Sequence, residues 1–201
     1  MKSNFRQQVS NYDCTPSCII NGLSYLFHRH EVPPFIVYRV YKDCLDGDAS
    51  RGTSERATRE MAYLLNSYRD PRYKSFAVEA KLIYGTQVHL RKKSKIIGCI
   101  EDGGAALLCV HSSNNFWHYI LAFYHEDGWL HCFDPSPRTR RYLNNDAVQF
   151  DLNSGHQEAN LLIRCDWLDR DFTGARNHHN NKYIFGSTDN RECFLLNRIS
   201  P

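Results

Sequence analysis

Apolar positions in the first third of the chain recur at helical spacing. Three segments show this period, namely residues 16–27, 35–45 and 55–68. The last follows Ser54, whose hydroxyl suits a helix N-cap, and its apolar stripe is continuous. For the first segment, Thr15 is the candidate N-cap and Pro16 suits the first helical turn. The middle segment is rich in β-branched residues, which leaves a strand open, although we favour a helix.

From about residue 76 the pattern changes to short apolar or alternating runs separated by turn residues, which is typical of strands. The runs are 76–83, 105–110, 119–124, 129–133, 161–165 and 193–196. Helices followed by strands, without regular alternation, predict an α+β fold with an antiparallel sheet and argue against a doubly wound parallel one. We expect a single domain over residues 1–201, helical to about residue 70 and sheet-based from about residue 71, because this length buries one sizeable core.

The composition is typical of a globular protein. Hydrophobic residues make up 42% of the chain and aromatic residues 13%, which is enough to offset the entropy cost of folding. No signal-peptide pattern follows Met1, and the longest apolar stretches are far shorter than the roughly 20 residues that span a bilayer. We therefore expect a cytoplasmic protein with no membrane partner. The net charge of +3 does not indicate a nucleic-acid partner, since such proteins usually carry a strongly basic face.

The eight cysteines are expected to be reduced thiols. Their spacing matches no zinc site, and the histidine pairs in residues 28–31 and 178–179 lack companions of a known ligand pattern. We expect no metal and no cofactor. Cys14 and Cys18 are about one helical turn apart, so a redox pair is one interpretation, while simple packing of Cys18 is the interpretation that we favour.

Cys14 stands at the predicted N-terminus of the first helix. The partial positive charge of a helix N-terminus lowers the pKa of a thiol and so favours the nucleophilic thiolate. Six residues earlier, Gln8 offers a side-chain amide that would help the Cys14 backbone N–H group to hold an oxyanion. Gln7 is the alternative donor if the loop is one residue tighter. The sequence therefore predicts Cys14 as a candidate nucleophile.

A predicted β-hairpin supplies the base. Residues 118–134 form two apolar runs around a turn at 125–128, and His118 and Asp134 are equidistant from position 126, which predicts that they are cross-strand neighbours. A two-residue turn at 127–128 would separate them by about one rung unless a bulge or a longer loop compensates. Asp134 would then orient His118 toward the thiol. His111 is the nearest rival base, but this register offers it no carboxylate.

In chain order, these motifs resemble the bacteriocin-processing peptidases of the papain-like superfamily, which cleave leader peptides after a double glycine. The resemblance covers roughly residues 8–135 and rests on Gln8, Asp13-Cys14, His118-Tyr119 and Asp134-Pro135. It implies a papain-like α+β fold in which N-terminal helices pack on a C-terminal antiparallel sheet. It also implies Cys14 as nucleophile, His118 as base, Asp134 as its orienting partner and Gln8 as oxyanion donor. After the nucleophile this family usually has glycine, and the chain instead has Thr15-Pro16.

These residues predict a thiol hydrolase that cleaves a peptide or amide bond through an acyl-enzyme intermediate. Two alternatives stay open, namely an acyltransferase that uses the same triad on a carrier-bound thioester, and an inactive peptide-binding module of the same fold. The basic runs 89–95 and 138–141 are typical of solvated surface. The second run follows Asp134 closely and would attract an acidic substrate or carrier protein. We interpret residues 169–182 as a surface loop.

Overall fold

The computed structural model describes residues 4–46, 52–112, 116–137, 146–151, 157–175 and 181–199. The α-helices are α1 (Cys14–Leu26), α2 (Pro34–Cys44), α3 (Glu55–Ser67), α4 (Lys95–Glu101) and α5 (Cys165–Leu168). The strands are β1 (Val78–Tyr84), β2 (Ala105–His111), β3 (Trp117–Glu126), β4 (Trp129–Phe133), β5 (Val148–Phe150), β6 (Leu161–Arg164) and β7 (Glu192–Arg198). Every strand pair in this part of the chain is antiparallel, which confirms the α+β fold with an antiparallel sheet.

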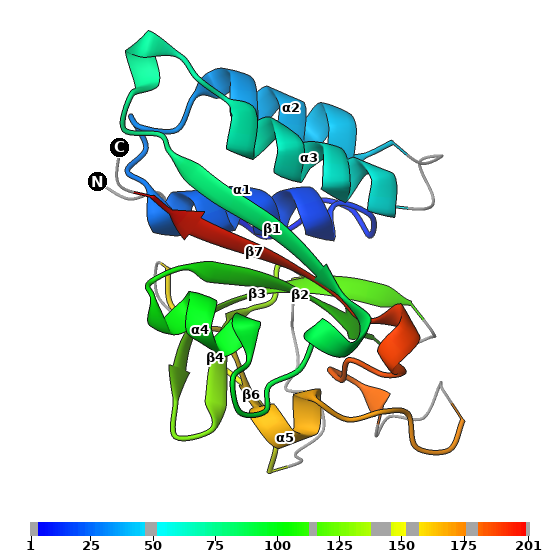
Figure 1. The fold of residues 1–201 in the computed structure, drawn as a ribbon. Coiled ribbons are helices and arrows are strands. Elements are labelled where there is room, and N and C mark those ends of the chain that lie inside the picture. The colour runs from blue at the N-terminus through cyan, green and yellow to red at the C-terminus, as the bar shows by residue number, and fades with distance from the viewer. Residues whose placement is uncertain are drawn as a thin grey trace.

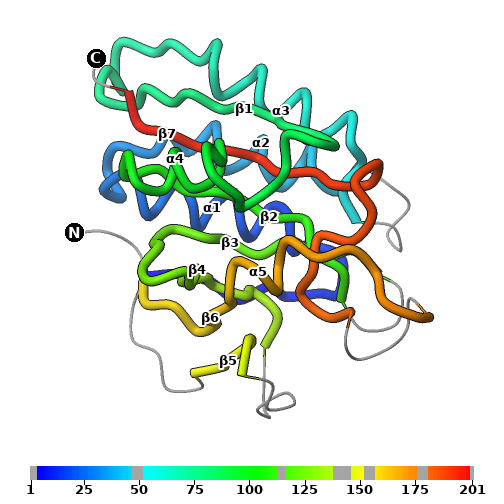
Figure 2. Tube along the Cα trace, turned by 60° about the horizontal axis from the view of Figure 1, so that its bottom comes forward, coloured from blue at the N-terminus to red at the C-terminus, as the bar shows by residue number. Residues whose placement is uncertain are grey.

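The strands form one sheet in the order β1-β7-β2-β3-β4-β6-β5. The late strand β7 therefore lies between β1 and β2, as the red segment in Figure 2 shows. Figure 1 shows α1, α2 and α3 on one side of the sheet and α4 on the other. Each side has its own apolar core, which explains why β2 is buried along its whole length and why its sequence is continuously apolar.

Helix α1 lies against the middle of the sheet. At Gly22 an added Cβ would lie 2.8 Å from Cδ1 of Leu196 and 3.4 Å from Cδ1 of Leu121. Because the position carries no side chain, the helix backbone approaches β7 and β3 closely. This approach holds the start of α1 beside the start of β3, where the candidate site lies.

The helix boundaries agree with the sequence pattern except at one cap. Ser54 caps α3 as predicted, because its Oγ accepts a hydrogen bond from the Ala57 N–H group at 3.1 Å. The prediction of Thr15 as the cap of α1 is wrong. The helix starts at Cys14, and Asp13 occupies the N-cap position without a side-chain capping bond. Its carboxylate accepts hydrogen bonds from the loop that precedes it.

Three short elements escaped the periodicity analysis, namely α4, α5 and β5, because each is too short to show a period. The basic run 89–95 overlaps α4, because Ser94 is the N-cap of this helix. Ile96, which directly follows the run, is buried. The stretch 169–182 has no regular helix or strand where the structure describes it, but it is not merely a surface loop. Asn181 is fully buried, and its side chain bonds to the backbone of Thr173 and Ala175.

The β3–β4 hairpin has the two-residue turn that we considered as an alternative. Asp127 and Gly128 both have positive φ, of 48° and 78°, and Glu126 pairs with Trp129, as in the turns that suit tight hairpins. The register then shifts between Ala122 and Tyr124. This bulge partly compensates for the short turn.

Within the described ranges, no helix combines the length and the apolar character needed to cross a lipid bilayer.

An ion pair between buried Glu31 and partly exposed Arg198 joins the loop after α1 to the end of β7. The Glu31 carboxylate accepts hydrogen bonds from Arg198 Nη2 at 2.7 Å and from the His28 N–H group at 2.7 Å. The hydrogen bonds from Arg198 outweigh burial and lower the pKa of Glu31 from 4.5 to about 2. A lowered pKa stabilises the fold above pH 4.5, and this stability is lost as the pH falls from 4.5 toward 2.

We predict that Glu31→Gln lowers the free energy of unfolding at neutral pH by about 1–2 kcal/mol, less than a fully buried pair because Arg198 is partly solvated. The variant should also flatten the dependence of stability on acidic pH. Urea unfolding at several pH values measures both effects. The control is Glu60→Gln, which removes the exposed pair with Arg56 and should change little. Equal losses in the two variants would contradict the prediction.

Candidate active site

Cys14 is the first residue of α1 and is partly buried. The loop before it is folded onto Asp13, which accepts hydrogen bonds from the N–H groups of Val9 at 2.9 Å and Ser10 at 2.6 Å. The first helical bond joins Ser17 N–H to the Asp13 carbonyl at 3.1 Å. The thiol is therefore fixed at a helix N-terminus, where the backbone N–H groups favour a negative charge.

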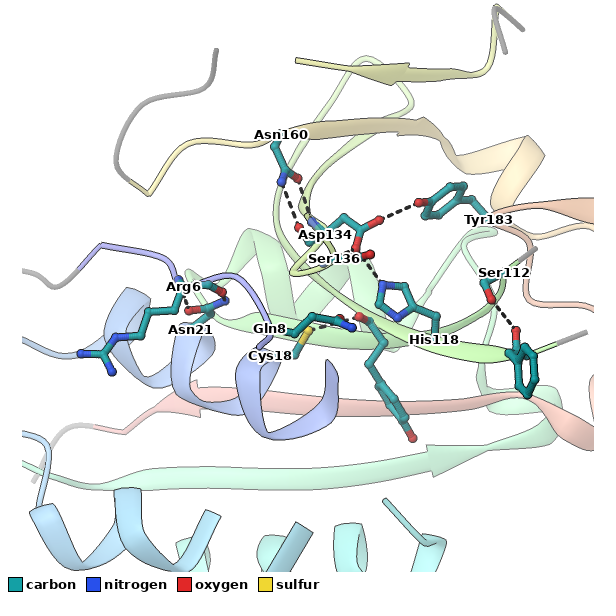
Figure 3. Close-up of polar contacts among 12 residues, drawn as sticks. Arg6, Gln8, Cys18, Asn21, Ser112, His118, Asp134, Ser136, Asn160 and Tyr183 are labelled. Carbon is teal, nitrogen blue, oxygen red and sulfur yellow. Dashed lines mark hydrogen bonds and ion pairs between the residues drawn. The ribbon is translucent and has the colours of Figure 1, made fainter. Parts of the chain in front are cut away.

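Gln8 is held close to the segment that carries Asp134. Its backbone N–H group donates to the carbonyl of Pro135 at 2.8 Å, and its side chain points toward His118 in the view of Figure 3. The Gln8 side-chain Nε2 donates to the Ser10 carbonyl at 2.7 Å, and Oε1 is buried with no hydrogen-bond partner among the described residues. The amide of Gln8 is thus committed to its own loop in this conformation. Gln7, the alternative donor, is exposed.

His118 and Asp134 meet through the hairpin. His118 Nε2 lies 2.7 Å from Asp134 Oδ1, and both side chains are buried. The last rung of the ladder pairs Leu121 with Phe133, so continuing this register places Asp134 opposite Ile120, two residues from His118 on the same face. The predicted contact is confirmed, and it is diagonal rather than directly across the strands.

Asp134 is fully buried and surrounded by donors (Figure 3). Its Oδ1 also accepts a hydrogen bond from the Ser136 N–H group at 2.9 Å, and its Oδ2 accepts one from the Tyr183 hydroxyl at 2.6 Å. The Asn160 side chain pairs with the backbone of Asp134 through bonds of 2.7 and 2.9 Å. The carboxylate that bonds to His118 therefore has a fixed position and orientation.

The electrostatics of Cys14 and His118 favour a charged pair. Burial opposes thiolate formation, but a hydrogen bond and the positive charge from His118, together with the Tyr119 N–H group, lower the pKa of Cys14 below 9.0. Burial alone would lower the pKa of His118, yet the charge and hydrogen bond of Asp134, with a further contribution from Cys14, raise it from 6.5 to about 10. Because Nε2 of His118 bonds to Asp134, Nδ1 is the nitrogen left for the thiol.

The lowered pKa of Cys14 distinguishes it from the other cysteines. Burial raises the pKa of each of the other thiols, namely Cys18, Cys44, Cys99, Cys109, Cys132, Cys165 and Cys193. Cys18 is fully buried and its Sγ donates to the Tyr119 carbonyl at 3.3 Å. Its environment is therefore that of a packed core thiol, as we favoured, and not that of a reactive partner for Cys14.

The other histidines considered, His111 as a base and the pairs considered as metal ligands, are not part of this arrangement where the structure describes them. His111 Nδ1 bonds to the Asn181 carbonyl at 2.9 Å, and the imidazole ring packs edge-to-face on Trp117 and Phe172. Glu31, next to the histidines of residues 28–30, is bound to Arg198. Among the described residues, no group of three potential ligands is placed to hold a metal ion. Residues 138–141 and 178–179 lie outside the described residues.

Two residues that touch Asp134 escaped the sequence analysis. Asn160 immediately precedes β6 and Tyr183 follows the stretch read as a loop. Neither lies in a recognisable motif, and no local periodicity links them to Asp134. Polar residues near strand ends are common in this sequence, so their position alone does not single out Asn160 or Tyr183.

The structure thus brings Cys14, His118 and Asp134 together and holds Gln8 beside them. The chain matches no model of a known protein family, and a search among curated proteins finds no match. Its function must therefore be inferred from the geometry and chemistry of the site.

We predict that Cys14 is alkylated by iodoacetamide faster than a free cysteine at and below neutral pH, because its pKa is lowered. Reactivity should fall as acid protonates the thiolate. In His118→Ala the titration of Cys14 should move upward, since the stabilising charge is lost. Peptide mapping by mass spectrometry measures each thiol separately, and the buried Cys18 is the internal control. Cys14 reacting no faster than a free cysteine would rule out an activated thiolate.

Proposed function

We propose that this protein is a papain-like thiol hydrolase that cleaves a peptide or amide bond. One observation carries the proposal. The thiol at the start of α1 and the imidazole of His118 are close enough to shift each other's pKa, and Nε2 of this imidazole bonds to a buried carboxylate. Nucleophile, base and orienting group therefore stand in the order that acyl transfer to sulfur requires.

The proposed reaction follows from these positions. The Cys14 thiolate attacks the substrate carbonyl carbon, and the carbonyl oxygen takes up the negative charge. The tetrahedral intermediate then expels the amine, which receives the proton that His118 carries, and an acyl-thioester remains on Cys14. His118, now neutral, takes a proton from water as that water attacks the thioester. Release of the acid restores the thiolate and the protonated imidazole, which the negative charge of Asp134 stabilises throughout.

Stabilisation of the oxyanion is assigned to two donors. The Cys14 N–H group belongs to the first turn of α1, where N–H groups have no partner within the helix. The Gln8 side chain is the second donor, and it must leave the Ser10 carbonyl to reach the oxyanion. The backbone bond from Gln8 to Pro135 keeps the base of this side chain close to the triad while the amide reorients. We infer that substrate binding drives this reorientation.

Two exposed apolar side chains, Val9 and Tyr12, lie in the loop that leads into Cys14. Apolar surface next to a reactive thiol supports binding of a substrate that extends beyond the cleaved bond. We therefore favour a peptide or an apolar acyl group over a small polar substrate.

Intact-mass spectrometry after incubation with libraries of peptides and thioesters tests the proposal. We expect an acyl adduct and turnover with the wild type, and we expect Cys14→Ala and His118→Ala each to abolish turnover while the fold is retained. Cys165→Ala, which removes a partly buried thiol from α5, is the control and should keep full activity. Activity retained in Cys14→Ala would refute the mechanism.

The same experiment separates the alternative reactions. An adduct that is released only when an amine is added would identify an acyltransferase. Peptide binding without any adduct, together with an unreactive Cys14, would identify a non-catalytic binding module and would refute the hydrolase.

Gln8→Ala is expected to lower kcat/KM by about 100-fold or more, because removing one oxyanion donor typically costs that much. The thermal unfolding temperature should change little, since the partly buried side chain makes its bond at an exposed site. Gln7→Ala is the matched control, because Gln7 is the exposed neighbour. Steady-state kinetics with any substrate found above gives the comparison. An equal loss in both variants would contradict the role assigned to Gln8.

A further inference from the structure

The second oxygen of Asp134 has a specific donor from a distant part of the chain. Tyr183 is separated from Asp134 by 49 residues, and its hydroxyl lies 2.6 Å from Oδ2. Asp134 is fully buried and Tyr183 is 3% exposed. A buried carboxylate oxygen without a donor carries a large desolvation cost. The Tyr183 hydroxyl therefore offsets part of this cost at Oδ2, while His118 and the Ser136 N–H group bond to Oδ1.

The backbone of Tyr183 is held in an unfavourable conformation by the surrounding structure. Its φ is +55°, in the left-handed region that is strained for a residue other than glycine. Its N–H group donates to the His111 carbonyl at 2.8 Å, and the His111 N–H group donates to the Ile184 carbonyl at 2.8 Å. These bonds form a bridge to the end of β2. They fix the direction in which the Tyr183 ring leaves the backbone.

The backbone before and after Tyr183 is also anchored. Asn181, two residues earlier, is fully buried and bonded to the backbone of Thr173. Phe185, two residues later, donates its N–H to the Leu168 carbonyl at 2.8 Å. The Tyr183 ring also packs at 66° against Phe150, with the ring centroids 5.6 Å apart. The Tyr183 hydroxyl that bonds to Asp134 is therefore carried by a segment with several anchoring contacts.

We propose that Tyr183 is a positioning residue of the triad, whose hydroxyl locks the Asp134 carboxylate so that Oδ1 faces His118 and the imidazole Nδ1 faces Cys14. This inference rests on the proposed function, and it extends the site to a residue that does not touch the reacting atoms. A carboxylate bonded at both oxygens keeps its rotation fixed. Without the hydroxyl, Oδ2 loses this donor, and the alignment of Asp134 with His118 is held less firmly.

The test compares Tyr183→Phe with the wild type. This variant keeps the packed ring and removes only the hydroxyl. The first measurement is the dependence of Cys14 alkylation on pH, which requires no substrate. We expect the inflection for Cys14 to move to higher pH and the rate at neutral pH to fall about tenfold, as the loss of one hydrogen bond to a charged group implies. With an active substrate, kcat should fall by a similar factor while KM changes little.

The matched control is Tyr25→Phe. Tyr25 donates its hydroxyl to the Phe123 carbonyl at 3.2 Å and lies eleven residues beyond Cys14, which is about 16 Å along α1. Thermal unfolding of both variants shows how much stability each has lost. If Tyr183 has only a structural role, both variants lose stability and neither changes the pH profile of Cys14. That result would overturn the proposal.

A double-mutant cycle gives a second test. If Tyr183 acts through the carboxylate, Tyr183→Phe changes nothing further in an Asp134→Asn background. Equal and independent effects in the two backgrounds would overturn the proposal. The outcomes also distinguish this inference from the proposed function. Failure to find any substrate would refute the hydrolase, whereas an unchanged alkylation profile with full turnover would refute only the role of Tyr183.

Discussion

The burial of one negative charge, on Asp134, is the constraint around which the site is built. A carboxylate removed from water must be surrounded by donors or it loses its charge. Here the donors come from separate parts of the chain, namely His118 on β3, the turn at Ser136 and the far segment at Tyr183. The histidine charge is in turn stabilised beside the thiol of Cys14. A single buried anion therefore connects the hairpin, the C-terminal half and the first helix.

The sequence was sufficient for the parts of this arrangement that depend on local pattern. Helical and alternating periods located the three N-terminal helices and most strands, and the hairpin brought His118 and Asp134 together. The exact register was not predictable, because the sequence pattern left open both the length of the turn and the presence of a bulge, and the structure combines a two-residue turn with a bulge beyond Ala122. Elements of one or two turns, such as α4, are too short for a period to appear.

The contacts that complete the site lie beyond local patterns. Asn160 and Tyr183 approach Asp134 only after the sheet has formed, and nothing in their neighbouring residues indicates this. The N-cap of α1 was misassigned for a related reason, since Asp13 turns its carboxylate toward the preceding loop instead of capping the helix. The choice of Cys14 among eight cysteines depended on its position at a helix start, and the raised pKa of the seven other thiols agrees with it.

The place of β7 in the sheet has a consequence for how the molecule assembles. In the described chain, β1 pairs only with β7, and β7 also pairs with β2. Helix α3 packs on β1 and on α2, so within the sheet this edge is joined to the remainder by a strand that lies far later in the chain. Pairing between strands as far apart in the sequence as β1 and β7 slows folding. During translation, β1 lacks its neighbouring strand until residues 192–198 have left the ribosome, and an unpaired strand edge exposed for that interval favours aggregation.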